Sequence, residues 1–187
     1  MAEKRYYMAC LDLEARSCLV VGGGSVGLEK ARGLLDCGAR VTVVAPGVGD
    51  EVRRLDVEVL EREYHASDLD GRFLVVAATS KVTLNRRIYK DAQSQSLLCN
   101  VVDVPDLCNF ILPAVLRVDP IAIAVSTGGA SPALAQRIRD DIADLIGPEH
   151  AELARKLREL RPWVRKQYPT YEERRRFFAD LVASELG

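Results

Sequence analysis

The sequence has few of the residues that metal sites and cross-linked folds require. Its 187 residues include only two histidines and five cysteines, with no Cys-x-x-Cys, His-x-x-His or His-Glu-x-x-His pattern. A zinc cage or a disulfide framework is therefore not expected, and no metal-binding residue is predicted. The cysteine count is odd, and Cys18 and Cys99 lie within apolar runs. These features favour a reducing cytoplasm as the location of the protein.

Long apolar runs and a large net charge are also absent. No run reaches the roughly 20 residues that cross a bilayer, and residues 1–7 lack the apolar core of a signal peptide. The net charge of −1 gives no general attraction for nucleic acid or for an anionic membrane. The hydrophobic content of 48% is ordinary and sufficient for a core. We therefore expect a cytoplasmic protein without a nucleic-acid or membrane partner.

A glycine-rich turn lies between an apolar run and a helical pattern. Gly22, Gly24 and Gly27 fit G-x-G-x-x-G, and a second β-branched run follows at 41–45. In this motif the first glycine permits a tight turn and the second lets the backbone approach a pyrophosphate. The third lets helix and strand pack closely, and the helix N-terminus offers free N–H groups to the anion. The motif predicts a dinucleotide site that includes Gly22, Gly23 and Gly24. Aspartate at Gly22 or Gly24 is expected to abolish nucleotide binding without preventing folding.

Strand-like runs alternate with helical patterns in the first part of the chain. The runs lie at 18–22, 41–45, 57–60, 73–78 and 97–102, and helical patterns lie at 26–37 and 81–92. This alternation predicts an α/β fold with a Rossmann-type parallel sheet. Short apolar runs at 110–113 and 121–125 precede helices expected at 132–146, at 149–166 and from 170 onward. We therefore predict a Rossmann domain at 1–114, a dimerisation and substrate segment at 115–147, and a small all-helical C-terminal region at 148–187.

The end of the second strand differs from many NAD-binding folds. Those folds place an acidic residue there to bind the ribose hydroxyls. This chain has Ala45 at that position, and no arginine beside it could bind a 2′-phosphate. We expect backbone groups of Pro46 and Gly47, or water, to hold the ribose. The Tyr-x-x-x-Lys pair that serves as acid and base in another large Rossmann class is also absent.

Two polar segments are candidates for substrate chemistry. Asp103 follows the fifth strand-like run, where a carboxylate faces the crevice of a parallel sheet. Alternatively, Asp103 only begins an Asx turn before Pro105. The loop at 126–131 precedes a helix whose N-terminus suits a substrate carboxylate, or it is an ordinary capped loop. Both pairs of alternatives are open at the level of sequence.

Taken in order, these motifs resemble the precorrin-2 dehydrogenase module of sirohaem synthases. The matching segments are 19–27 with Lys30 and Ala31, 77–79 with Asn85, 99–103, 110–113 and 124–135. The resemblance covers about residues 6–165. It implies oxidation of precorrin-2 to sirohydrochlorin with NAD as cofactor, in a homodimer with intertwined central segments. Some members of the family also insert ferrous iron to give sirohaem, and this chain could belong to either kind.

The resemblance also implies roles for individual residues. It assigns dehydrogenation, and iron insertion where that occurs, to Asp103, which we expect to act as the base. The expected cofactor-binding residues are Gly22, Gly23, Gly24, Ser25, Val26, Pro46, Gly47 and Thr79. The expected substrate-binding residues are Asn100, Ser126, Thr127, Gly128, Gly129 and Ser131. We also expect no fused methyltransferase, so that a separate protein supplies precorrin-2.

Two other functions remain open at this stage. One is a nucleotide-sensing regulatory domain, such as the ligand-gated modules of ion transporters. Such domains usually have the acidic residue that Ala45 replaces, and they do not need the segments 99–103 and 124–135. The other is a different oxidoreductase on the same scaffold, since a fold does not determine a function.

Overall fold

The computed structural model describes residues 5–186, which form two compact units. The first unit ends at Ile111 and the second begins at Leu112. The three-part division at 114 and 147 stays a prediction. No helix within residues 5–186 combines the length and the apolar character that a membrane span needs.

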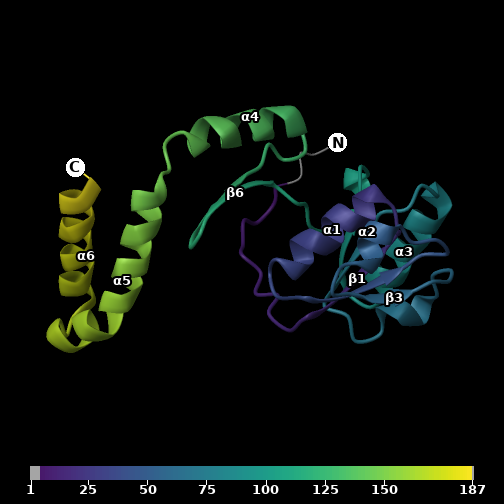
Figure 1. Ribbon diagram of the computed structural model, residues 1–187, viewed down its shortest axis with the longest axis horizontal. Coiled ribbons are helices and arrows are strands. Elements are labelled where there is room, and N and C mark those ends of the chain that lie inside the picture. Colours follow the sequence, from purple (N-terminus) through teal and green to yellow (C-terminus); the bar gives the residue numbers. More distant parts are fainter. Residues whose placement is uncertain (1–4, 187) are drawn as a thin grey trace. The chain divides into compact units, whose positions relative to one another are not determined.

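The first unit is built on a five-stranded parallel sheet with the strand order β3-β2-β1-β4-β5 (Figure 1). Its strands are β1 (Ser17–Val21), β2 (Arg40–Val44), β3 (Glu58–Leu60), β4 (Leu74–Ala77) and β5 (Leu98–Val101). Its helices are α1 (Ser25–Leu35), α2 (Asp50–Arg53) and α3 (Val82–Ser94), with 3-10 turns η1 (Ala66–Leu69) and η2 (Pro105–Leu107). The Rossmann-type α/β fold predicted from the sequence is confirmed.

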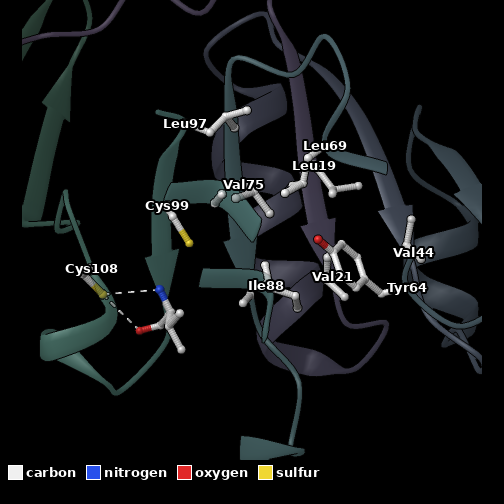
Figure 2. Close-up of a cluster of buried hydrophobic side chains, with 13 residues drawn as sticks. Leu19, Val21, Val44, Tyr64, Leu69, Val75, Ile88, Leu97, Cys99 and Cys108 are labelled. Carbon is white, nitrogen blue, oxygen red and sulfur yellow. Dashed lines mark hydrogen bonds between the residues drawn. The ribbon is translucent and has the colours of Figure 1, made fainter. Parts of the chain in front are cut away.

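The central strands are buried on both faces of the sheet. Alternate residues of a strand point to opposite faces, so each face has its own core cluster. On one face, Leu19 and Val21 of β1 pack in a cluster with Ile88 of α3 (Figure 2). On the other face, Val20 of β1 packs in a cluster with Leu28 of α1. Because both faces are covered, the strands read as continuous apolar runs.

The second unit combines a β-hairpin with three helices (Figure 1). Strands β6 (Ala114–Val118) and β7 (Ile121–Val125) pair antiparallel. Helix α4 (Pro132–Ala143) packs on this hairpin, and α5 (Pro148–Gln167) packs against α6 (Tyr171–Leu186). Trp163, Tyr168 and Phe177 form an aromatic cluster between α5 and α6 with ring centroids 5.3–6.4 Å apart.

Two helix starts in this unit follow the expected capping chemistry. The Ser131 hydroxyl accepts a hydrogen bond of 3.2 Å from the Leu134 N–H at the start of α4. Before α6, the Thr170 N–H donates to Glu173 and the Glu173 N–H donates back to the Thr170 hydroxyl. Ser131 is thus the N-cap of α4, and Thr170 and Glu173 form a capping box at the start of α6.

The apolar run at 110–113 forms no strand. The Asn100 side-chain amide donates to the Phe110 carbonyl oxygen at 3.0 Å, and Phe110 packs against the core of the first unit. Pro113 has no N–H to offer a strand partner, so the hairpin ladder begins at Ala114. Arg117 lies within β6.

A buried carboxylate secures the connection between β3 and β4. Asp68 is 7% exposed, and its two oxygens accept hydrogen bonds of 2.6 and 2.9 Å from the Arg62 guanidinium. The His65 N–H donates to the same carboxylate at 2.9 Å. The hydrogen bonds from Arg62 lower the pKa of Asp68 below its usual value.

We expect Asp68→Asn to reduce the free energy of unfolding at pH 7 by about 1–2 kcal/mol, since Arg62 is itself partly screened by solvent. A carboxyl with a lowered pKa stabilises the fold above its unfolded pKa of about 4 and loses this effect as the pH falls. The difference between variant and wild type should therefore shrink below about pH 4. Urea denaturation at pH 7 and at pH 3 measures this. The exposed Asp56→Asn is the control, and an equal difference at both pH values would contradict the assignment.

Candidate functional site

A cleft of about 720 Å³ lies at the carboxyl ends of the parallel strands in the first unit. It spans the point between β1 and β4 where the strand order reverses, which is where open α/β sheets bind ligands. The cleft is lined by residues 21–26, 44–47 and 78–81, with Glu63, Tyr64, Thr83, Leu84, Arg87, Val102 and Asp103. The sequence-predicted cofactor residues are all among them.

The glycines of the motif have different roles. Gly22 has φ +129°, and a Cβ there would overlap the carbonyl oxygen of Ala78 after β4. A Cβ at Gly27 would overlap the carbonyl oxygen of Gly22, so this glycine lets α1 pack against the turn. Gly24, by contrast, has no atom within 4 Å of an added Cβ. Gly22 and Gly27 therefore shape the fold, whereas Gly24 keeps space open on the cleft side.

Helix α1 presents its N-terminus to this open space. The helix begins at Ser25 with Gly24 as its N-cap, and Gly24 has no side chain that could occupy the first N–H groups. Those groups have no partners within the helix. Ser25 and Val26 are exposed and line the cleft. Free N–H donors beside an open cradle fit the pyrophosphate of a dinucleotide.

The β2 end of the cleft carries no charged side chain among its lining residues 44–47. Ala45 is buried, and its N–H donates to the Leu60 carbonyl oxygen of β3 at 3.2 Å. Pro46 and Gly47 are exposed. The Gly23 carbonyl oxygen accepts a hydrogen bond from the Gly49 N–H, which ties the glycine-rich turn to this segment. Backbone groups are thus the polar groups offered at this end.

The loop after β4 is fixed by Thr79 and Asn85. The Thr79 hydroxyl donates to the Asn85 side-chain oxygen at 2.7 Å, and the Asn85 amide donates to the Thr79 carbonyl oxygen at 2.9 Å. Asn85 is 7% exposed, so this pair is sheltered from water. Thr79 therefore lines the cleft with a loop whose shape is held by α3.

Four charged or phenolic side chains on the cleft wall were not found from the sequence. They are Glu63, Tyr64, Lys81 and Arg87. Burial raises the pKa of Tyr64 far above its usual value, and its phenol donates to Asp91 at 3.1 Å. Tyr64 is therefore a poor base. No local motif marks these residues, because they meet only when β3, η1 and α3 pack together.

Asp103 lies directly after β5 and lines the cleft. It occupies the turn that the Val104 N–H closes on the Val101 carbonyl oxygen at 3.2 Å, with φ +61°. Among residues 5–186, no hydrogen-bond or ion-pair partner of its exposed carboxylate is found. Asp103 is thus a turn residue, but its side chain does not close the turn and is left available to a ligand.

The residues expected to bind substrate belong to both units. Asn100 is 8% exposed, and its amide is used within the fold by Phe110. The residues at 126–131 belong to the second unit. There the Thr127 hydroxyl oxygen accepts from the Ser131 N–H at 3.1 Å, and Gly128 and Gly129 have φ +64° and +89°. Substrate binding by these residues stays a prediction.

The described part of the chain, residues 5–186, has no group of three or more His, Cys, Asp or Glu side chains that could hold a metal ion. Burial also raises the pKa of the Cys18 thiol to about 11 and that of Cys99 to about 12. These thiols stay protonated near neutral pH and are not nucleophiles.

Comparison with known families identifies both units. Residues 9–114 match a family described as "Putative NAD(P)-binding", and residues 118–145 match "Sirohaem biosynthesis protein central". The nicotinamide type of cofactor expected from the glycine motif is therefore supported at the level of NAD(P).

Individual relatives agree with these matches. The siroheme synthase of Ectopseudomonas mendocina (strain ymp) is 42% identical over 94% of this chain and 38% of its own length. That of Salmonella typhi is 40% identical over 93% of this chain and 39% of its own length. The chain thus spans about two fifths of these curated relatives. The solved structure of SirC, precorrin-2 dehydrogenase, is 27% identical with a TM-score of 0.79, covering 97% of this chain and 93% of SirC. The resemblance inferred from the sequence motifs is confirmed.

The glycine geometry changes what substitutions should do. The expectation that aspartate at Gly22 leaves the fold intact was wrong, because a side chain there meets the backbone of Ala78. Gly24→Asp is the informative variant. We expect it to fold and to lose NAD⁺ binding, since its carboxylate would occupy and repel the pyrophosphate position.

Isothermal titration and thermal denaturation would test this. Gly33→Asp is a matched control, because Gly33 is also exposed on α1 with no atom within 4 Å of an added Cβ. It should bind NAD⁺ as wild type does. Unchanged affinity in Gly24→Asp would contradict the assignment of the cradle.

Proposed function

The chain belongs to the NAD(P)-binding family matched at residues 9–114, and from this premise we propose that it oxidises precorrin-2 to sirohydrochlorin with NAD⁺. The observation that carries the proposal is an unpartnered carboxylate, Asp103, in the same cleft as a dinucleotide cradle. A nucleotide sensor needs the cradle but not the carboxylate. The similarity to SirC and to siroheme synthases supports the choice of substrate.

The charges of the cleft favour NAD⁺ over NADP⁺. In this fold the adenosine ribose lies at the end of the second strand. The lining residues there, 44–47, are uncharged, and the next lining residue along the chain is Glu63. A 2′-phosphate at that position would meet no cation among the lining residues 44–47. Backbone groups of Pro46 and Gly47 suffice for neutral ribose hydroxyls.

The position of the adenosine half also indicates which carboxylate acts as the base. With the adenosine half at β2, the reacting half of a dinucleotide falls on the side of β4 and β5. Asp103 follows β5, whereas Glu63 follows β3 at the opposite end of the sheet. Glu63 also has Lys81 within 4.0 Å. Asp103 is therefore the carboxylate that can reach a substrate on the reacting side.

The reaction removes two hydrogens from the substrate, one as hydride and one as a proton. When bound, the nicotinamide supplies the hydride acceptor. The Asp103 carboxylate takes the proton, and Tyr64 cannot replace it because its phenol stays protonated. The helix α1 N-terminus and the Gly24 cradle hold the pyrophosphate and so orient the reacting half.

The substrate carries eight carboxylates, so its recognition needs donors rather than an apolar slot. Lys81 and Arg87 supply cations on the cleft wall, whereas the N–H groups of Gly128, Ala130 and Ser131 donate within their own loop. We therefore propose that Lys81 and Arg87 of the cleft wall hold substrate carboxylates.

We expect Asp103→Asn and Asp103→Ala to lower the dehydrogenation rate roughly 10²–10⁴-fold, as the loss of a positioned base does. Asparagine is the sharper variant because it tolerates the left-handed backbone at this position. The affinity for NAD⁺ should stay unchanged. Either variant should also lose any iron insertion, because that reaction removes two protons from pyrrole nitrogens.

The conversion is followed by the absorption spectrum of precorrin-2 incubated with NAD⁺ and the protein. Spectral conversion supports the dehydrogenase, whereas NAD⁺ binding without conversion supports a nucleotide sensor. A wild-type dehydrogenation rate in Asp103→Asn would show that Asp103 only forms the turn and does not act as the base. Cofactor binding and substrate positioning would then have to account for the reaction.

We propose that the chain works as a homodimer whose interface includes β7 and α4. Residues of both hairpin strands alternate between half-buried and exposed, and Ala135 is the buried residue of α4. Leu134 and Ile138 of α4 are 52% and 37% exposed. An apolar helix face of this kind is typical of an interface that a second copy covers.

Light scattering at micromolar concentration should give twice the chain mass of 20.6 kDa. The double variant Leu134→Glu/Ile138→Glu should shift the protein to the monomer, because glutamate is costly to bury at an interface. Tyr171→Glu, at an exposed aromatic of α6, is the control and should remain dimeric. A wild-type monomer with full activity would contradict the proposal.

A further inference from the structure

Strand β5 lies at one end of the sheet, so one of its edges has no neighbouring strand. An unpaired strand edge leaves backbone N–H and carbonyl groups that need other partners. The backbone groups that point away from β4 belong to alternate residues: Cys99 and Val101 of β5, and Leu97 just before it. Side chains of the segment that follows η2 serve these groups.

Asn109 covers the first half of this edge. Its side-chain oxygen accepts from the Cys99 N–H at 2.7 Å, and its side-chain amide donates to the Leu97 carbonyl oxygen at 2.9 Å. Its own backbone N–H donates to the Cys99 carbonyl oxygen at 3.0 Å. Asn109 thus makes the hydrogen bonds that a residue of a neighbouring strand would make with this edge.

Cys108 covers the second half with its thiol. The sulfur accepts from the Val101 N–H at 3.3 Å and lies 3.2 Å from the Val101 carbonyl oxygen, to which it can donate (Figure 2). It lies 3.3 Å from the Val104 carbonyl oxygen, a second acceptor for the same proton. The side chain is 6% exposed, so water competes poorly for these groups.

Among the residues bonded by the Cys108 sulfur, Val101 and Val104 are the two ends of the turn that carries Asp103. Val101 and Val104 also bond to each other, and Asp103 between them has φ +61°. Aspartate adopts this left-handed backbone more readily than most residues other than glycine, and the hydrogen bonds at both ends of the turn help to keep it in place. The Cys108 side chain contacts both ends of the turn.

We propose that Cys108 is a positioning residue whose thiol holds the 101–104 turn and thereby aims the Asp103 carboxylate into the cleft. This inference rests on the proposed function of Asp103 as the base. Without the thiol, the Val101 N–H and the Val104 carbonyl oxygen lose a partner, and the turn gains freedom. A base displaced by about 1 Å can cost a reaction up to about 10²-fold.

We expect Cys108→Ala to lower kcat by about ten- to a hundredfold while the affinity for NAD⁺ stays unchanged. Cys108→Ser keeps a donor and an acceptor and should recover part of the rate. Cys18→Ala is the matched control, since Cys18 is also buried but lies on β1 in the core cluster on the other face of the sheet. A wild-type kcat in Cys108→Ala, or an equal loss in Cys18→Ala, would overturn the proposal.

A double variant separates this proposal from the proposed function. If Cys108 acts through Asp103, adding Cys108→Ala to Asp103→Asn should change the rate little, because the base is already lost. The same fold loss in both backgrounds would overturn the positioning role and leave the base assignment intact. A full rate in Asp103→Asn alone would instead overturn the base assignment and with it the positioning role.

Amide hydrogen exchange gives a readout that does not depend on activity. The Val101 N–H should exchange faster in Cys108→Ala than in wild type, and Cys108→Ser should restore part of the protection. Cys18→Ala should leave Val101 unchanged. Unchanged exchange at Val101 in Cys108→Ala would show that the thiol does not hold the turn and would overturn the proposal.

Discussion

The close approach of the Gly22 backbone to its neighbours is the constraint on which the site depends. A side chain at Gly22 would meet the Ala78 carbonyl oxygen after β4, and one at Gly27 would meet Gly22 itself. The turn after β1 is therefore held between the end of β4 and helix α1, which begins directly after the turn. Only with this packing does α1 direct its first N–H groups into the cleft. The cradle is therefore a consequence of how tightly the sheet, turn and helix fit.

The fold could be predicted largely because its signals are local. Continuous apolar runs marked the strands, and Ser131 and Thr170 marked helix starts through hydrogen bonds within four residues. The apolar run at 110–113 forms no strand, because Phe110 and Ile111 pack against the core clusters of the first unit. The Asn100 side-chain amide donates a hydrogen bond to the Phe110 carbonyl oxygen of this run. No short sequence pattern predicts this contact.

Some residues of the site could likewise be predicted from the sequence, and others could not. Gly22, Gly24 and Asp103 could be placed from the sequence because each adjoins the end of a strand, and strand ends meet at one edge of a parallel sheet. Lys81 and Arg87 could not, since α3 has to pack before they reach the cleft wall. The separate roles of the three glycines could not be predicted from the sequence either, because they depend on distances in the folded protein. The motif gives three positions, but only the distance to Ala78 shows that Gly22 cannot change without harm to the fold.

The two halves of the cleft are supported by different means, and this has a consequence for function. The cradle lies over β1, where neighbouring strands on both sides hold the backbone. The Asp103 turn follows β5, whose outer edge has no strand beside it. There Asn109 and Cys108 take the place of a neighbouring strand with amide and thiol groups. Substitutions along this edge should therefore affect the chemical step more than cofactor binding, because the cradle is restrained independently of it.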